Sequence, residues 1–397
     1  MRPVALLLLL LTVPSPSSAD ERFTGFDSFV SQYREAPADS RKELVQSFIA
    51  WQQARGGFPL IEADGSVVFF FQGSGQEKDV RVIGDFKQRT FSVAWDEAGE
   101  ALSRASESGE VFFKRLEFEQ DARLEYRFIV DGAQKPDPLN PHTLDNGVIG
   151  MVSALEMPAY KEAPEVAVRE DVPKGTLTML AEAWATPKVT VYLPANYEAS
   201  KRYPVVYTAD GSAWINYLKL PTVLDNLIAD GAIEPVIAVM IDPAADRSSW
   251  YQFNPEYLAY LEKVVAYVDG HYPTRPRAED RLHLGSSAGG RCSLYVGLER
   301  PGLFRKLAML SPSLAGAPSY YEPYFSRRKR PDPKLRIWMS AGSYERYIHE
   351  DTRLMERYFK ETGLKPRVVY THRGHSLGSW RSLSVDVLKF FFPAERH

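Results

Sequence analysis

The stretch Gly285-Ser286-Ser287-Ala288-Gly289 carries most of the fold information in this chain, because it has the form G-x-S-x-G with Ser287 at its centre. This spacing is typical of a sharp turn between a strand and a helix that lifts one serine out of a sheet. The turn is crowded, so a Cβ at either flanking glycine would clash. Residues 281–284 fit a buried strand and residues 290–298 fit a helix. This context favours a nucleophilic serine over a chance run of small residues.

A serine hydroxyl needs a base to take its proton, and that base is usually a histidine. Four histidines follow the pentapeptide. His397 ends the chain and His349 lies at the start of a predicted helix, whereas His372 and His375 lie in a loop after an apolar strand pattern. Gly374 is predicted to turn this loop and present its neighbour. We therefore expect His375 to be the base, with His372 as the alternative.

An acidic residue that orients the imidazole is expected after an intervening strand. Residues 335–340 have such a strand pattern and lead into Glu345. Asp351, six residues further on, is the alternative acid. Either carboxylate would stabilise the charged form of the base.

Backbone N–H groups are expected to bind the oxyanion that forms during acyl transfer. The helix predicted after Ser287 would point its free N–H groups at that position, and Ala288 supplies the first of them. A second donor normally comes from the loop after an early strand. The strand pattern 203–208 is followed by Gly211 and Ser212, whose N–H groups are the candidates.

The first residues predict export. Arg2 precedes a short apolar run, residues 4–11, and small residues follow up to Ala19. This order is typical of a secretory signal, with cleavage after about Ala19, which would place the mature protein in the periplasm or outside the cell. The apolar run is too short to span a membrane, and no later segment is expected to insert into one.

Composition excludes several functional classes. The chain has 48 Lys and Arg against 51 Asp and Glu, and this net charge of -3 argues against a general nucleic-acid binder. Cys292 is the single cysteine, so no intramolecular disulfide can form, and we expect it to be a buried packing residue. No metal-ligand cluster is recognised, and no cofactor is expected.

Periodicity divides the chain into five parts. Residues 1–19 are the predicted signal, and residues 20–58 are predicted to be helical, with a capping box of Ser40 and Glu43. Residues 59–160 alternate as short strands of a small all-β sandwich. Residues 161–175 have the composition of a linker. Residues 176–397 alternate between strands and helices, which predicts an α/β domain with a mostly parallel sheet covered on both faces.

Residues 176–393 resemble the putative esterase family of α/β-hydrolases, which includes enterochelin, feruloyl and acetyl-xylan esterases. The matching segments are Tyr203-Pro204-Val205-Val206-Tyr207, Asp210-Gly211, the pentapeptide with Gly290, Gly342-Ser343-Tyr344-Glu345, Gly374-His375 and Trp380-Arg381. The resemblance implies an α/β-hydrolase fold. It also implies Glu345 as the acid, His375 as the base and Trp380 as a residue of the site.

Residues 60–158 resemble the early-set, immunoglobulin-like sandwich that precedes the catalytic domain in enterochelin esterases. Gly84-Asp85-Phe86, residues 126–132 and residues 137–141 carry this resemblance. Starch-binding relatives have an aromatic residue just after the first motif, and this chain does not. We therefore favour a sandwich that packs on the hydrolase and shapes one wall of its cleft, over a sandwich that binds glycans.

Candidate substrate contacts come from loops that follow strands, where ligands bind in open α/β sheets. Aromatic residues including Tyr324 precede residues 326–330, of which four are cationic, and together they would suit an anionic aromatic ligand. Trp214, Arg247 and Trp250 follow two other strand patterns and are further candidates.

The expected function is that of an exported serine esterase that cleaves a small-molecule or glycan ester, most like the enterochelin type that opens ferric siderophore trilactones. The alternatives are a feruloyl or acetyl-xylan type of carbohydrate esterase and an acyltransferase of the same fold. The alternative from another class is a non-catalytic protein that binds a siderophore or a glycan.

Overall fold

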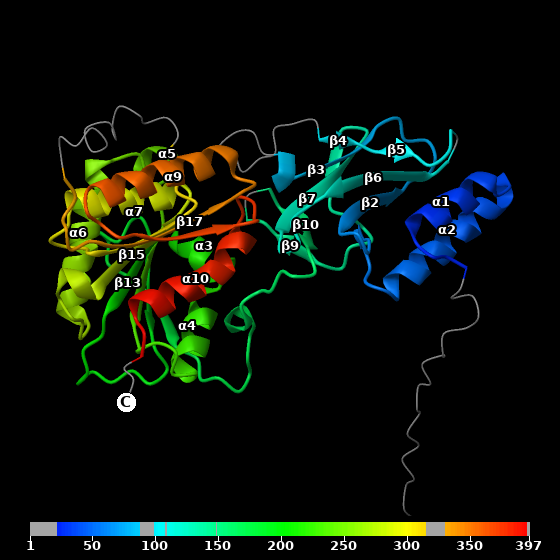
Figure 1. Cartoon of the computed structure of the whole chain (residues 1–397). Coiled ribbons are helices and arrows are strands. Elements are labelled where there is room, and N and C mark those ends of the chain that lie inside the picture. The colour runs from blue at the N-terminus through cyan, green and yellow to red at the C-terminus, as the bar shows by residue number, and fades with distance from the viewer. Residues whose placement is uncertain (1–21, 88–98, 108, 148, 315–329, 395–397) are drawn as a thin grey trace, which may run out of the picture.

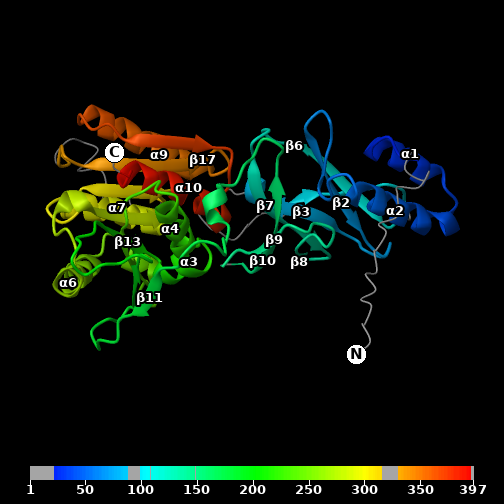
Figure 2. The same ribbon diagram turned by 90° about the horizontal axis from the view of Figure 1, so that it is seen from below.

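The computed structural model describes residues 22–87, 99–107, 109–147, 149–314 and 330–394. Its parts lie in a row, with a pair of N-terminal helices at one end, a β-sandwich in the middle and a larger α/β domain at the other end (Figure 1, Figure 2). The predicted signal, residues 1–19, lies outside the described residues, and so does the loop that contains Tyr324.

An eight-stranded sheet forms the centre of the α/β domain. In spatial order its strands are β11 (Thr176–Met179), β12 (Val189–Leu193), β14 (Ile237–Ile241), β13 (Val205–Ala209), β15 (Arg281–Ser286), β16 (Lys306–Leu310), β17 (Arg336–Gly342) and β18 (Arg367–Thr371). The first two pairings are antiparallel and all the others are parallel. The predicted mostly parallel sheet is therefore confirmed.

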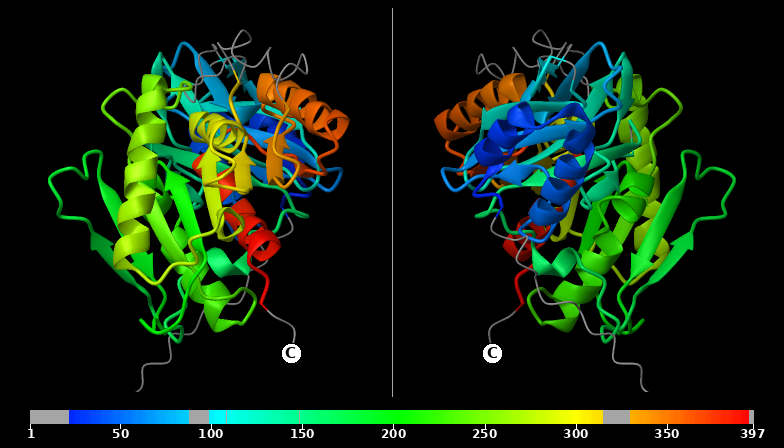
Figure 3. Two further views of the ribbon diagram at one scale, coloured as in Figure 1. Left: turned by 90° about the vertical axis from the view of Figure 1, so that its left-hand side faces the viewer. Right: turned by 90° about the vertical axis from the view of Figure 1, so that its right-hand side faces the viewer.

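Helices cover both faces of this sheet (Figure 3). One face carries α3 (Gly211–Asn216), α4 (Leu220–Ala229) and α10 (Leu377–Phe391), and the other carries α6 (Pro255–His271), α7 (Ala288–Glu299) and α9 (Arg346–Glu361), with the short α5 (Arg247–Trp250) before α6. Strand β13 shows why both faces need a cover. Val205 and Tyr207 enter one hydrophobic cluster and Val206 enters the other. No helix among the described residues is both long and apolar enough to span a membrane.

Two antiparallel sheets form the sandwich. One contains β1 (Leu60–Ile61), β2 (Ser66–Gln72), β6 (Val111–Glu117) and β5 (Ser103–Arg104), and the other contains β4 (Glu100–Ala101), β3 (Val80–Gly84), β7 (Arg123–Val130), β10 (Met151–Glu156) and β9 (Thr143–Asp145), with β8 (Ala133–Lys135) paired to β7. Phe69 and Phe71 from β2 meet Tyr126 and Phe128 from β7 in the core between the sheets. The predicted order of a β domain before an α/β domain is confirmed.

The N-terminal helices cover the outer face of the sandwich. Helices α1 (Phe26–Glu35) and α2 (Ala38–Gln53) pack aromatic side chains on Phe70, which points away from the core between the two sheets. Both faces of β2 are therefore buried, and this explains why residues 67–71 form a continuous apolar run without alternation.

The capping box predicted at Ser40 is wrong. Helix α2 begins two residues earlier, at Ala38, with Pro37 as its N-cap, so Ser40 lies inside the first turn. Its backbone N–H donates to the carbonyl of Pro37. The fixed φ of proline orients the chain for a helix that starts at once, and Asp39 places a negative charge in the first turn.

The segment predicted as a linker, residues 161–175, is held against the α/β domain. Val166, at the end of a short 3₁₀ turn, is buried in the cluster beneath α4 and α10. Glu162 accepts hydrogen bonds from Arg381, and the N–H of Ala163 donates to Ser382. The connection therefore fixes the sandwich to the hydrolase instead of acting as a loose tether.

Candidate active site

Ser287 lies at the turn between β15 and α7, and its backbone adopts φ 55° and ψ -122°. A positive φ is strained for a residue with a Cβ, and such strain is found at functional sites. A Cβ on Gly285 would lie 2.2 Å from the carbonyl oxygen of Gly289, so only glycine fits there. A Cβ on Gly289 would lie 3.0 Å from a carboxylate oxygen of Asp210. Gly285 thus performs the steric role that the motif predicts, whereas a Cβ at Gly289 would make a tight contact and not a clash.

His375 joins the predicted nucleophile to the predicted acid. Its Nε2 lies 2.8 Å from the Ser287 Oγ, and its Nδ1 lies 2.5 Å from the Glu345 Oε1. His375 is 3% exposed, and its imidazole meets the Trp380 ring edge-on, with 4.8 Å between the centroids. The ring is therefore fixed from three sides, which is the arrangement expected of a general base.

Gly374 has a different role from the one predicted. Its backbone is not in the left-handed region, so the loop does not need a glycine to turn there. A Cβ at this position would instead lie 2.1 Å from the Asp85 Cγ of the sandwich. Glycine is required at position 374 because another domain approaches the loop closely.

The other histidines after Ser287 lie elsewhere. His372 Nδ1 contacts Asp121 on the surface at a distance of 2.5 Å. His349 lies in α9 and packs edge-on against Tyr370, and burial lowers its pKa. His397 is outside the described residues.

Glu345 is the N-cap residue of α9 and is 3% exposed. Its Oε2 accepts hydrogen bonds from the Ser311 Oγ at 2.8 Å and from the Gly342 N–H at 2.5 Å, which leaves Oε1 for His375. Asp351, the alternative acid, lies inside α9, where burial raises its pKa to about 6, and its carboxylate has no hydrogen bond to His375 among the described residues. The geometry therefore brings Glu345 to the imidazole.

Ser311 is a residue of the site that the sequence reasoning missed. It directly follows β16 and has φ 46°. Its Oγ accepts a hydrogen bond from the Trp380 Nε1 at 2.8 Å and donates to Glu345. The one available signal was its position at the carboxyl end of a central parallel strand.

The predicted oxyanion donors differ in availability. The Ser212 N–H donates to the Asp242 carboxylate at 2.5 Å, and the Ser212 Oγ donates to the same group, so the prediction for Ser212 as a donor is wrong in this structure. The acceptor of this N–H is the carboxylate of Asp242, which directly follows the neighbouring strand β14. Among the described residues, the N–H groups of Ala288 and Gly211 have no acceptor, so both remain open donors.

A pocket of about 530 Å³ opens at Ser287. Its lining comes from both domains and consists of Gly147, Asp210, Ser212, Ala213, Tyr217, Asp242, Pro243, Arg247, Ser286, Ser287, Leu377 and Trp380. Gly147 belongs to the sandwich, so the sandwich forms part of one wall, as expected. A second pocket of the same volume lies beside α2, and none of the predicted site residues line it.

The candidate substrate contacts divide into two groups. Trp380 and Arg247 line the pocket, but the Arg247 guanidinium forms a bidentate pair with Asp210, at 2.6 and 2.8 Å. Trp214 is wholly buried in the hydrophobic core, and Trp250 packs on Tyr260 and Tyr257 outside the pocket. The predictions for Trp214 and Trp250 are therefore wrong, because both indoles serve packing. Tyr324 lies outside the described residues.

A buried histidine lies beneath the elbow. His283 in β15 is fully buried, with Nδ1 2.8 Å from the Ser293 Oγ and Nε2 2.7 Å from the Tyr257 hydroxyl. Burial lowers its pKa to about 3, whereas an unfolded histidine titrates near 6.5. Below pH 6.5 this histidine therefore binds a proton in the unfolded chain but not in the folded chain. The free energy of unfolding consequently decreases as the pH is lowered.

We expect this histidine to reduce the free energy of unfolding by about 2 kcal/mol between pH 7 and pH 5. Urea unfolding of wild type and His283→Gln at both pH values measures the effect. The variant is less stable at pH 7, because two buried hydrogen bonds change, but it should lose about 2 kcal/mol less than wild type on acidification. His142→Gln, at an exposed loop position, is the control. Equal acid sensitivity in His283→Gln and wild type would contradict the prediction.

The fold and the elbow define the class of this protein. A mostly parallel sheet with helices on both faces, and a strained serine between a central strand and the following helix, is the α/β-hydrolase architecture.

The family model described as "Putative esterase" matches residues 184–383, just over half of the chain. The chain belongs to this esterase family, which confirms the resemblance predicted from its motifs.

Curated proteins that are similar in sequence include two esterases. The endo-1,4-beta-xylanase/feruloyl esterase of Xylanibacter ruminicola is 26% identical over 276 residues, which are 64% of this chain and 36% of that protein. The iron(III) enterobactin esterase of Escherichia coli is 27% identical over 179 residues, which are 42% of this chain and 43% of that protein. The chain thus spans less than half the length of either relative in these matches.

Solved structures show the same fold. The ferric enterobactin esterase from Salmonella typhimurium has a TM-score of 0.73 at 18% identity, over 86% of this chain and 98% of that chain. The enterobactin esterase from Shigella flexneri has a TM-score of 0.70 at 19% identity, over 86% of this chain and 97% of that chain. The likeness covers more than the α/β domain and therefore includes the sandwich.

Proposed function

We propose that this protein is an exported serine esterase with a triad of Ser287, His375 and Glu345. The Ser287 Oγ attacks the ester carbonyl carbon while its proton passes to the His375 Nε2, and the oxyanion is held by the N–H groups of Ala288 and Gly211. The alcohol leaves with that proton. Water then attacks the acyl-enzyme and gives a proton to His375, which returns it to the Ser287 Oγ as the bond to the acyl group breaks and the acid is released. Glu345 keeps the imidazole oriented throughout.

The observation that carries this proposal is the continuous chain of hydrogen bonds from the Ser287 Oγ through His375 to Glu345. A protein that only bound its ligand would gain nothing from a strained serine joined to a buried imidazole and a buried carboxylate. Export is part of the proposal and depends on the signal pattern of residues 1–19.

For the substrate we propose an ester whose acid portion carries an aromatic ring. The side chains of Trp380, Leu377 and Tyr217 give the pocket an apolar side beside Ser287 that suits a flat ring. The enterochelin type is supported by the enterobactin esterase relative and by the fold that this chain shares with two such enzymes.

The charges of the pocket favour the second candidate, a feruloyl-type ester. Arg247 is paired with Asp210, and Lys188 contacts Asp242 at 3.2 Å. Arg247 is the one cation within the described lining, and a carboxylate balances it; Lys188 contacts Asp242 from outside the lining. A ferric catecholate complex is strongly anionic and would have to approach these carboxylates, whereas a feruloyl ester is neutral.

A substrate panel tests the proposal. We expect hydrolysis of p-nitrophenyl acetate and methyl ferulate, and an iron-free catecholate trilactone cleaved at least about ten-fold faster than its ferric complex, a difference of about 1.4 kcal/mol. Acetylated xylan completes the panel, and added glycerol detects acyl transfer as glyceryl ester. Preference for the ferric complex would contradict the charge argument and support the enterochelin type. If none of these esters were hydrolysed, the esterase proposal would be contradicted.

A further inference from the structure

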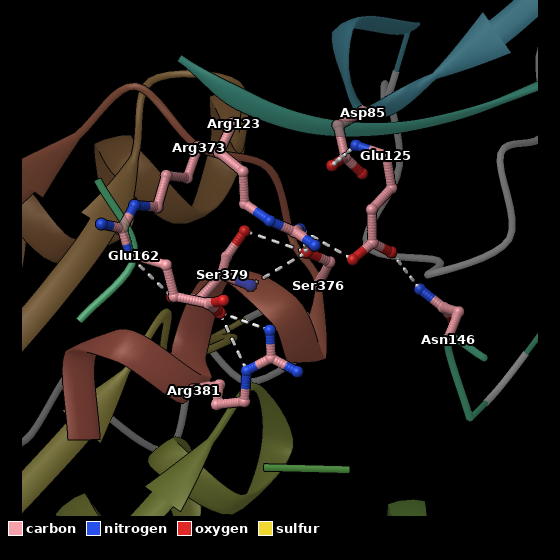
Figure 4. A network of polar contacts seen from close by, with 9 residues as sticks. All are labelled: Asp85, Arg123, Glu125, Asn146, Glu162, Arg373, Ser376, Ser379 and Arg381. Atoms are coloured by element: carbon pink, nitrogen blue, oxygen red, sulfur yellow. Dashed lines mark hydrogen bonds and ion pairs between the residues drawn. The ribbon is translucent and has the colours of Figure 1, made fainter. Parts of the chain in front are cut away.

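A polar network joins the sandwich to the loop that carries His375 (Figure 4). Residues 118–125 of the sandwich lie against residues 372–378. The backbone N–H of Arg123 donates to the carbonyl of His372 at 3.1 Å, and Arg123 forms a parallel bridge with Arg373. Arg123, the first residue of β7, thus pairs through its backbone with the loop of the other domain. The loop is therefore held by backbone contacts as well as by side chains.

Arg123 lies at the centre of the network. Its guanidinium is 2% exposed, and Nη1 donates to the Glu125 Oε1 at 2.8 Å and to the Ser376 Oγ at 3.3 Å. Glu125 is fully buried and accepts a second hydrogen bond from Asn146 at 2.6 Å. The backbone N–H of Glu125 donates to Asp85 at 2.8 Å. Figure 4 shows that Arg123 extends from the sandwich toward the start of α10, where Ser376 is the N-cap residue.

Both sides of His375 are in contact with this network. A Cβ at Gly374 would overlap Asp85, and a Cβ at Gly378 would lie 2.3 Å from the Arg123 Nη2. Ser376, next to the imidazole, accepts the hydrogen bond from Arg123. The loop therefore cannot shift toward the sandwich without meeting buried side chains, and a shift away would break a charge-assisted hydrogen bond.

The same segment of the sandwich also touches the loop of the acid. The hydroxyl of Tyr344 donates to Glu119, and its ring lies 6.1 Å from that of Phe118. Tyr344 directly precedes Glu345. Residues 118–125 thus contact the loops of two members of the proposed triad, which reach the site from different strands.

A buried ion pair contributes little net stability compared with apolar packing of the same volume. Stability alone therefore does not explain the ion pair of Arg123 and Glu125 at this junction. A role in catalysis does, because a shift of about 1 Å in a catalytic group can lower the rate by about 100-fold.

We propose that Arg123 is a positioning residue of the esterase, and that the sandwich sets the place of the base through the contact of Arg123 with Ser376. This inference rests on the proposed function, because it takes His375 as the base. Arg123 does not line the pocket, so the proposal concerns the rate of the chemical step and not the affinity for the ester.

Arg123→Lys is the first test, because lysine keeps the charge opposite Glu125 but lacks the length and fork of arginine. In the full chain we expect kcat to fall by about ten- to 100-fold with KM changed less than about two-fold, and labelling of Ser287 by a fluorophosphonate to slow in parallel. The double variant Arg123→Met/Glu125→Met removes both partners of the ion pair together, so neither is left buried opposite an apolar side chain, and it serves if the lysine variant misfolds. It should show the same loss in kcat.

A double-mutant cycle with Ser376→Ala tests the route of the effect. If Arg123 acts through Ser376, the two losses in kcat are strongly non-additive. Arg115→Met is the matched control, because Arg115 pairs with Asp27 and Glu62 on the outer side of the sandwich. It should keep kcat within about two-fold.

The urea midpoint of each variant separates folding from positioning, because a purely structural role lowers the midpoint but leaves the kcat of folded enzyme unchanged. An unchanged kcat in folded Arg123→Lys, or additive losses in the cycle, would overturn the positioning role while wild type stays active. Inactive wild type, or active Ser287→Ala, would overturn the proposed function itself.

Discussion

Replacement of Ser287 by alanine should lower kcat for p-nitrophenyl acetate by about four to six orders of magnitude, with KM changed much less. The loss is large because the alanine side chain has no oxygen to attack the ester, so the remaining rate comes from water and the oxyanion donors alone. The fold should persist, because the Ser287 side chain donates only toward His375 and alanine also has a Cβ in the strained turn.

The measurement combines steady-state hydrolysis with fluorophosphonate labelling. Wild type should gain one covalent phosphonyl group on the peptide that contains Ser287, and the alanine variant should gain none. Ser200→Ala, at an exposed position outside the pocket, is the control and should match wild type in both assays. Hydrolysis by Ser287→Ala at the wild-type rate would refute the mechanism. Wild type that neither reacts nor hydrolyses would point to the binding protein instead.

Glu345→Gln should lower kcat by about three to four orders of magnitude. Glutamine keeps the size of the side chain but removes the charge that stabilises the imidazolium, and its amide can favour the wrong tautomer of His375. A loss of 10⁴-fold corresponds to about 5.5 kcal/mol of transition-state stabilisation.

The matched control for this prediction is Asp351→Asn, which makes the same chemical change at the other candidate acid. It should keep kcat within about three-fold, because the Asp351 carboxylate accepts a hydrogen bond from the Leu314 backbone and not from His375. If Asp351→Asn lost as much activity as Glu345→Gln, the choice of acid would be wrong.

The local parts of the site could be predicted from sequence. The elbow is a strand, a turn and a helix within twenty residues, so Ser287 and its glycines leave a readable pattern. His375 and Glu345 follow late strands in a fixed order, and parallel strands bring their carboxyl ends to one edge. The continuous apolar run of β2 also contained a signal, since it indicated a cover on both faces of that strand.

The rest depends on distant segments that meet only in the folded chain. The N–H of Ser212 is taken by Asp242, thirty residues later, and Ser311 gains its role from Trp380 and Glu345. Trp214 resembled a loop aromatic because its helix is only six residues long, yet that helix packs directly on the sheet. Such contacts have no period in the sequence and no short motif.

The order of synthesis gives a further meaning to the junction around Arg123. Domains generally fold as units from the N-terminus as the chain is made. The segment 118–125 is synthesised some 250 residues before the loop 372–378. The folded sandwich can therefore provide a surface against which the loop 372–378, the part of the active site that is synthesised last, packs. We expect the enzyme to become active only when α10 has docked, so that a chain released before residue 372 is made carries the nucleophile but no base.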